Sequence, residues 1–146
     1  MITKLTNINL INSNLKANSK KEIFEELAQM LFENNRIKSV DAFLSDVEAR
    51  ESVSVTSTDG IAYPHSKSKA VIEPAIAIGV KRGGIEYGDE DGIKPSIFFM
   101  IASPENGGDH HIYVLQDLFG KFSDEFITDI HTAKNEQQIL NILINS

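Results

Sequence analysis

The sequence predicts an α/β (α+β) fold, in which helices flank both faces of a mixed, mostly parallel β-sheet. Amphipathic helical patterns occur before and after a group of strand-like segments. Two of these segments, Ala75–Val80 and Ser96–Ala102, are continuous apolar runs, which are typical of central strands covered on both faces. The 146 residues contain no internal repeat, low-complexity tract or Pro/Gly-rich linker, so we expect a single domain spanning residues 1–146.

The N-terminal third is predicted to contain one strand followed by two helices. Ile8–Asn14 alternates loosely between apolar and polar residues, which favours a short first strand. Ser19 and Glu22 have the spacing of a capping box, and apolar residues then recur at helical intervals as far as about residue 34. A second helix with a buried apolar stripe is expected over residues 39–50.

Short strands and turns are predicted in the middle of the chain, and helices at its end. Val53–Val55 and Gly60–Tyr63 are short and strand-like, with turn-forming residues at Thr58–Gly60. Lys81–Lys94 is charged and contains four glycines, which indicates a hairpin or an excursion between the two central strands. Three C-terminal helices are expected, capped by Asp109, Ser123 and Asn135, the first of them ending at Phe122.

Composition limits the chemistry that the chain can perform. The absence of cysteine excludes a disulfide framework, a thiolate nucleophile and cysteine-based metal sites. The longest apolar runs have six residues, far below the roughly 20 needed to cross a bilayer, so we expect no membrane insertion. The N-terminus has no apolar signal core, so we expect a cytoplasmic protein. The net charge of -7 disfavours non-specific binding to nucleic acid or to anionic membranes.

His65 is the first candidate functional residue. Gly60 permits an unusual turn, and Pro64 fixes its own φ while disfavouring helical geometry at Tyr63. His65 is therefore expected at the end of an apolar strand, on backbone with little freedom. The polar stretch Ser66–Lys69 follows, and its amides and hydroxyls could meet an anion. The alternative is an ordinary surface histidine at a strand end.

His111 is the second candidate. On the helix that begins after Asp109, it shares one face with Leu115, Leu118 and Phe122, whereas His110 points about 100° away. The positive end of the helix dipole disfavours an imidazolium there, so a neutral imidazole that donates one hydrogen bond is expected. The alternative is a buried histidine whose ring is satisfied by a main-chain carbonyl.

Arg50 is the third candidate, and two interpretations remain open for it. It can simply complement the C-terminal dipole of the second helix, or its guanidinium can bind a phosphoryl group. His131 is expected to be structural. The sequence contains no glycine-rich phosphate loop, zinc-protease motif or Gly-x-Ser-x-Gly elbow, and adjacent His110 and His111 cannot both face one metal ion on a helix.

The whole chain resembles the enzyme IIA component of the fructose/mannitol class of the bacterial phosphoenolpyruvate-dependent sugar phosphotransferase system. The most specific part of the resemblance is Gly60-Ile-Ala-Tyr-Pro-His65. It is accompanied, in order along the chain, by Arg50-Glu51, Lys67-Ser-Lys-Ala-Val71, Glu73-Pro-Ala75, Asp91-Gly92, Phe98-Phe-Met-Ile-Ala-Ser-Pro-Glu105, and His111 with Leu115 and Leu118.

This resemblance implies a mixed sheet flanked by helices and a role in phosphoryl transfer. The residue that the family phosphorylates corresponds to His65, with His111 beside it and Arg50 assisting the phosphoryl group. The implied donor is the histidine phosphocarrier protein, and the implied acceptor is a cysteine of enzyme IIB, in a pathway that energises sugar uptake of the fructose-like class. No cofactor or metal is expected, because the phosphoryl group arrives already activated.

One segment departs from the family, and other functions remain open. Members of the family usually have Ser-Thr-Gly-Ile-Gly-Asn before Gly-Ile-Ala, whereas this chain has Ser54-Val-Thr-Ser-Thr-Asp59. The altered segment puts backbone-amide contacts to a phosphoryl group in doubt, more than the identity of His65. The alternatives are a regulatory relative of the nitrogen type, which acts by phosphorylation-dependent protein binding, and a hydrolase with His65 as general base.

Overall fold

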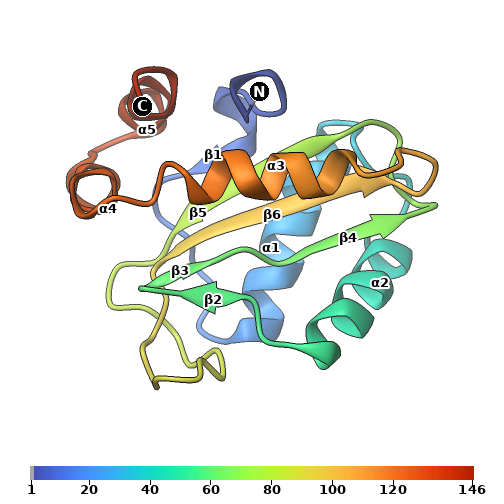
Figure 1. Ribbon diagram of the computed structural model, residues 1–146, viewed down its shortest axis with the longest axis horizontal. Coiled ribbons are helices and arrows are strands. Elements are labelled where there is room, and N and C mark those ends of the chain that lie inside the picture. The colour runs from blue at the N-terminus through green and yellow to red at the C-terminus, as the bar shows by residue number, and fades with distance from the viewer. Residues whose placement is uncertain (1) are drawn as a thin grey trace.

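The computed structural model describes residues 2–146, which form one sheet with helices on both of its faces (Figure 1). The helices and strands in chain order are the 3-10 turns η1 (Ile2–Lys4) and η2 (Ile8–Leu10), then β1 (Ile11–Asn12), α1 (Lys20–Glu33), α2 (Val40–Val53), β2 (Ser57–Thr58), β3 (Ile61–Ala62), β4 (His65–Ser68), β5 (Ala75–Val80), β6 (Ile97–Pro104), α3 (His110–Phe119), α4 (Asp124–Thr132) and α5 (Glu136–Ile144). No helix of residues 2–146 is both long enough and apolar enough to cross a membrane.

The sheet is mixed, as predicted. Its strand order is β1-β5-β6-β3-β2, and β4 pairs with β6 beyond β3. Among the described strands, β1–β5, β3–β6 and β4–β6 are parallel pairs, whereas β2–β3 and β5–β6 are antiparallel. Residues 81–96 connect β5 to its antiparallel neighbour β6, which confirms the hairpin connection expected for the charged, glycine-containing segment.

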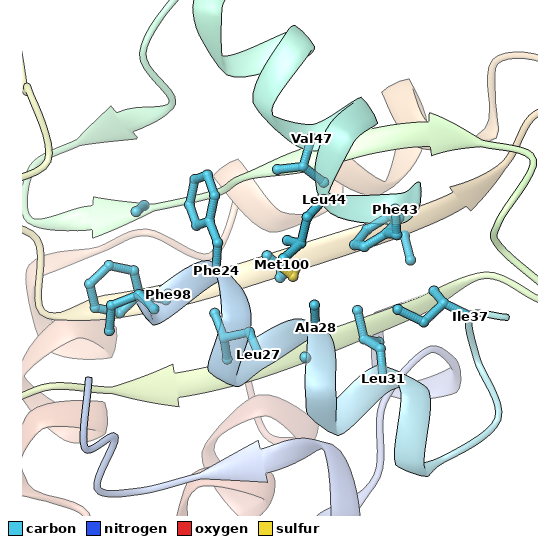
Figure 2. Packing of buried hydrophobic residues seen from close by; sticks show 14 of the residues in the cluster. Phe24, Leu27, Ala28, Leu31, Ile37, Phe43, Leu44, Val47, Phe98 and Met100 are labelled. Atoms are coloured by element: carbon cyan, nitrogen blue, oxygen red, sulfur yellow. The ribbon is translucent and has the colours of Figure 1, made fainter. Parts of the chain in front are cut away.

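Each face of the sheet has its own apolar core. Successive side chains of β6 alternate between the two, so Phe98 and Met100 belong to one core and Phe99 to the other. The first core lies against α1 and α2, as Figure 2 shows for side chains such as Leu27 and Phe43. The second core is formed with α3, α4 and α5. This two-sided burial explains why β5 and β6 are continuous apolar runs.

The predicted caps of α1, α4 and α5 are confirmed. Ser19, Ser123 and Asn135 each accept a hydrogen bond from a main-chain N–H in the first turn of their helix. Asp109 lies at the N-cap position of α3, but its side chain makes no capping hydrogen bond. Its backbone has φ -92° and ψ 13°, rather than the extended geometry that places a cap side chain over the first N–H groups.

Several element boundaries differ from the prediction. Val53–Val55 is not a strand, because Val53 is the last residue of α2 and its side chain is 80% exposed. The first strand is only Ile11–Asn12, since the preceding residues form the turn η2, which the Asn7 side chain caps. The helix α3 ends at Phe119 instead of Phe122, and turn hydrogen bonds follow it.

Candidate functional site

His65 lies where a strand is interrupted beside β6. β3 and β4 follow one another along the same neighbour, since Ile61 pairs with Ile97 and His65 pairs with Ile101. Between them, Pro64 cannot donate a main-chain hydrogen bond, but its carbonyl accepts one from Ile101 at 2.9 Å. The sequence placed His65 at the end of a strand, whereas it is the first residue of β4. Its side chain is buried, with 7% exposure.

The imidazole of His65 has its two nitrogens in different environments. Nδ1 lies 2.8 Å from the carbonyl oxygen of Tyr63. Because a carbonyl can only accept, Nδ1 carries the proton and donates, and Nε2 has the free lone pair. The Tyr63 ring is also stacked on the imidazole, with centroids 6.2 Å apart and 13° between the ring planes. These contacts fix both the tautomer and the orientation of the ring.

The surroundings of His65 favour its neutral form. Burial is the largest cause that lowers the pKa of His65 below its ordinary value of 6.5, and the electrostatic effects of the Arg50 guanidinium and of the His111 ring lower it further. The hydrogen bond to Tyr63 and the Glu51 carboxylate oppose this change without reversing it. At neutral pH, His65 is therefore an uncharged base with one nitrogen available as a nucleophile.

His111 is the second residue of α3 and is half-buried. It is near enough to lower the pKa of His65, so the structure brings together two histidines that are 46 positions apart in the sequence. Among the residues that the structure describes, Nδ1 of His111 has no hydrogen-bond partner, and neither has Nδ1 of His110. The structure therefore does not contain the hydrogen bond from Nδ1 of His111 to a main-chain carbonyl that the alternative interpretation requires.

Arg50 lies in the last turn of α2, and its surroundings bear on both interpretations of it. Its position complements the helix C-terminus, and its Nη1 donates to the carbonyl of Ser54 at 3.1 Å. Its charge also acts on His65. The structure therefore brings together all three residues singled out from the sequence, with a cation and a second imidazole beside a neutral imidazole.

The sequence did not reveal the polar cluster that lies behind this site. Glu51, which follows Arg50, is 8% exposed and binds Lys20 from α1, Thr56 from the altered segment and, weakly, Tyr87 from the β5–β6 connection. Lys20 and Tyr87 are 31 and 36 residues away in the chain. The Arg50-Glu51 pair was visible in the sequence as part of a motif. The partners of Glu51 were not, because no periodicity connects residues that far apart.

The altered segment before His65 forms a β-hairpin. Ser57 and Thr58 pair with Ala62 and Ile61, and the turn between them is Asp59-Gly60, with φ of 50° and 87°. Both values lie in the left-handed region, which Asp tolerates and Gly adopts freely. The Ser57 hydroxyl donates to the carboxylate of Asp89, so the hairpin is tied to the β5–β6 connection.

The polar stretch after His65 is mostly engaged within the protein. The hydroxyl of Ser66 donates to the carbonyl of Lys67 at 2.9 Å. The hydroxyl of Ser68 donates to Asp46 at 2.6 Å and accepts from the amide of Ala70 at 3.0 Å. These two hydroxyls are therefore not free donors for an anion, contrary to the possibility raised from the sequence.

The remaining histidine lies elsewhere. His131 Nε2 is 2.5 Å from the hydroxyl of Ser96, and burial lowers the pKa of His131, with Arg82 adding to the effect. Within residues 2–146, no group of three His, Asp or Glu side chains is arranged to hold a metal ion.

Comparison with known proteins defines the class to which this fold and site belong. Residues 4–146 match the model of the family described as "Phosphoenolpyruvate-dependent sugar phosphotransferase system, EIIA 2". The chain belongs to this family, and it is an EIIA component of the phosphotransferase system. Phosphotransfer is the activity that the description of this family names.

Three proteins illustrate the relationship. The chain is 31% identical to the PTS system fructose-specific EIIABC component of Bacillus subtilis over 144 residues, which are 97% of this chain and 23% of that protein. The crystal structure of the nitrogen regulatory protein IIA-Ntr from Neisseria meningitidis has a TM-score of 0.89 and 26% identity, covering 97% of this chain and 98% of that one. The enzyme IIAMTL–phosphorylated IIBMTL complex from Escherichia coli matches with a TM-score of 0.83 and 18% identity over 97% of this chain and 98% of that one, which is a likeness of fold.

Proposed function

We propose that Nε2 of His65 accepts a phosphoryl group from the histidine phosphocarrier protein and passes it to a cysteine of an enzyme IIB. In the first step, the P–N bond to the donor histidine breaks as a P–N bond to His65 forms. In the second step, the P–N bond to His65 breaks as a P–S bond to the cysteine forms. The observation that carries the proposal is the bond from Nδ1 of His65 to Tyr63, which leaves the Nε2 lone pair free on a neutral ring.

Arg50 and His111 complete this proposal. Phosphoryl transfer proceeds through a loose transition state whose charge is spread over three oxygens, so catalysis consists mainly of positioning and charge neutralisation. The guanidinium of Arg50 offsets part of that charge. The ring of His111, whose Nδ1 has no partner in the described residues, donates a hydrogen bond to a phosphoryl oxygen.

The proposed setting is sugar uptake of the fructose-like class, with the relay in the cytoplasm. The Bacillus subtilis relative is named as fructose-specific, and the Escherichia coli structure pairs an enzyme IIA with a phosphorylated IIB. No nucleic acid, membrane insertion, metal or cofactor takes part in the proposed steps. The likeness to the Neisseria meningitidis nitrogen regulatory protein supports a second candidate, regulation of another protein through the phosphorylation state of His65.

The test reconstitutes the relay from phosphoenolpyruvate, enzyme I and the phosphocarrier protein. His65→Ala is expected to abolish phosphoryl uptake, whereas His111→Ala chiefly slows onward transfer to IIB. An unlabelled wild-type His65, or equal loss of uptake in both variants, would contradict the assigned roles. Screening purified IIB proteins as acceptors separates the two settings, because a purely regulatory protein has no IIB to which it transfers rapidly.

A further inference from the structure

A buried carboxylate holds the segment that leads to His65. Glu51 Oε2 accepts from the ammonium of Lys20 at 2.9 Å and from the amide of Thr56 at 2.9 Å. Its Oε1 accepts from the hydroxyl of Thr56 at 2.5 Å. Because the side chain of Glu51 is only 7% exposed, these contacts take the place of water around the charge.

Lys20 is itself held in place. Besides Glu51, its ammonium donates to the main-chain carbonyl of Tyr87 at 3.0 Å and lies 4.0 Å from the centre of the Tyr87 ring. Lys20 thus joins the start of α1, where it stands, to the end of α2 and to the β5–β6 connection. The cation therefore has one well-defined position opposite the carboxylate.

Hydrogen bonds, joined through the backbone of Thr56 and of Tyr63, connect this cluster to the imidazole. The carbonyl of Thr56 accepts from the amide of Tyr63 at 3.0 Å. The carbonyl of Tyr63 accepts from Nδ1 of His65 at 2.8 Å. The position of Thr56 thus sets the position of the Tyr63 peptide, which in turn selects the tautomer and the direction of Nε2.

We propose that Lys20 and Glu51 are positioning residues for phosphoryl transfer, acting on His65 through Thr56 and the Tyr63 peptide. The inference rests on the proposed function, because it names what orients the imidazole in that reaction. It also gives a role to the segment 54–59, whose sequence departs from the family, because Thr56 of this segment binds Glu51 through both its amide and its hydroxyl.

The test uses Glu51→Gln and Lys20→Met in the full chain, with two readouts. The first is the single-turnover rate of phosphoryl acceptance from the phosphocarrier protein. The second is the ¹⁵N chemical shift of each His65 ring nitrogen, which reports the tautomer without any phosphoryl transfer. Lys20→Arg keeps the cation and serves as the conservative variant, and Arg36→Met removes an ion pair elsewhere on the molecule, Arg36–Glu73 at 3.2 Å, whose carboxylate is exposed.

In both test variants, we expect acceptance to slow by about tenfold or more, because small displacements of a reacting group are costly. We expect the nitrogen shifts to move toward a mixture of tautomers, whereas Lys20→Arg restores most of the rate and Arg36→Met changes neither readout. Folded variants with wild-type rate and wild-type shifts would overturn the proposal. If Glu51→Gln does not fold, Lys20→Met decides, since Lys20 is 28% exposed. Failure of wild-type His65 to be phosphorylated would refute the proposed function instead, and the nitrogen shifts would still test the positioning.

Discussion

The pH dependence of phosphoryl acceptance gives the sharpest test of the His65 environment. The perturbation is a decrease in pH from 8 to 5, which protonates an ordinary histidine around its usual pKa of 6.5. Protonation of Nε2 removes the lone pair that the proposed reaction uses. Burial, Arg50 and His111 lower the pKa of His65, so the rate should decrease at a more acidic pH than it would for an ordinary histidine.

The direction of the pKa change sets a numerical threshold. At pH 6.5 an ordinary histidine is half protonated, so more than half of His65 must still be neutral at that pH. The acceptance rate at pH 6.5 should therefore exceed half of the rate at pH 8. When NMR measures the neutral fraction of His65 directly, this fraction should likewise exceed one half at pH 6.5.

The assay combines rapid-quench measurement of phosphoryl acceptance with NMR titration of the imidazole. The NMR titration separates His65 from any titration of the donor protein. His131→Gln is the control, because burial also lowers the pKa of His131 but this residue contacts Ser96 rather than His65. A His65 midpoint at or above pH 6.5 would refute the argument from burial and neighbouring charge.

The stability of the fold should follow pH in the same direction. A histidine whose pKa is lowered in the folded state binds its proton more readily when unfolded. Its contribution to stability is complete above pH 6.5 and is lost as the pH falls from 6.5 through the folded-state pKa. The free energy of unfolding should therefore decrease on acidification, by at most about 1.4 kcal/mol per pH unit for each such histidine.

Two further predictions concern stability, and thermal unfolding checks both. Arg82→Met removes a guanidinium that donates to three main-chain carbonyls at 2.6 to 3.3 Å, so we expect the free energy of unfolding to fall by about 1–2 kcal/mol. The control is Lys81→Met, which removes one exposed hydrogen bond and should change the stability little. A Tm decrease in Lys81→Met equal to that in Arg82→Met would contradict this. Gly79→Ala places a Cβ 2.7 Å from Cγ of the buried Leu15, so we expect a cost of about 1–3 kcal/mol. At Gly120 the nearest atoms to an added Cβ are 3.5 and 3.6 Å away, so Gly120→Ala should be neutral or stabilising. If Gly120→Ala destabilised the protein and Gly79→Ala did not, the packing argument would be refuted.

The fold class was predictable because its signals are local. Caps such as Ser19 and Ser123 act within one helical turn, and the apolar runs of β5 and β6 report burial on both faces. Boundaries were less predictable where a turn competes with a regular element. The prediction of a strand at Val53–Val55 was wrong because helical hydrogen bonding continues through Val53.

The candidate site was only partly predictable. His65 was singled out from the sequence because Gly60 permits an unusual turn and Pro64 restricts the backbone immediately before the histidine. The tautomer of His65 could not be predicted, since it depends on where the Tyr63 carbonyl points. The turn at Thr58–Gly60 was predicted, but the side-chain contacts of Glu51 with Thr56 and of Asp89 with Ser57, which hold the segment before His65, were not.

By itself, the sequence determined the fold class, the rigid Pro64–His65 step and the family to which the chain belongs, because each depends on neighbouring residues or on a motif. Only the tertiary structure decided that Arg50 and His111 act on one imidazole, and that Lys20 reaches Glu51 across 31 residues. Those contacts depend on how the helices pack on the two faces of the sheet. Packing is set by the sum of many apolar contacts, and no local pattern in the chain encodes it.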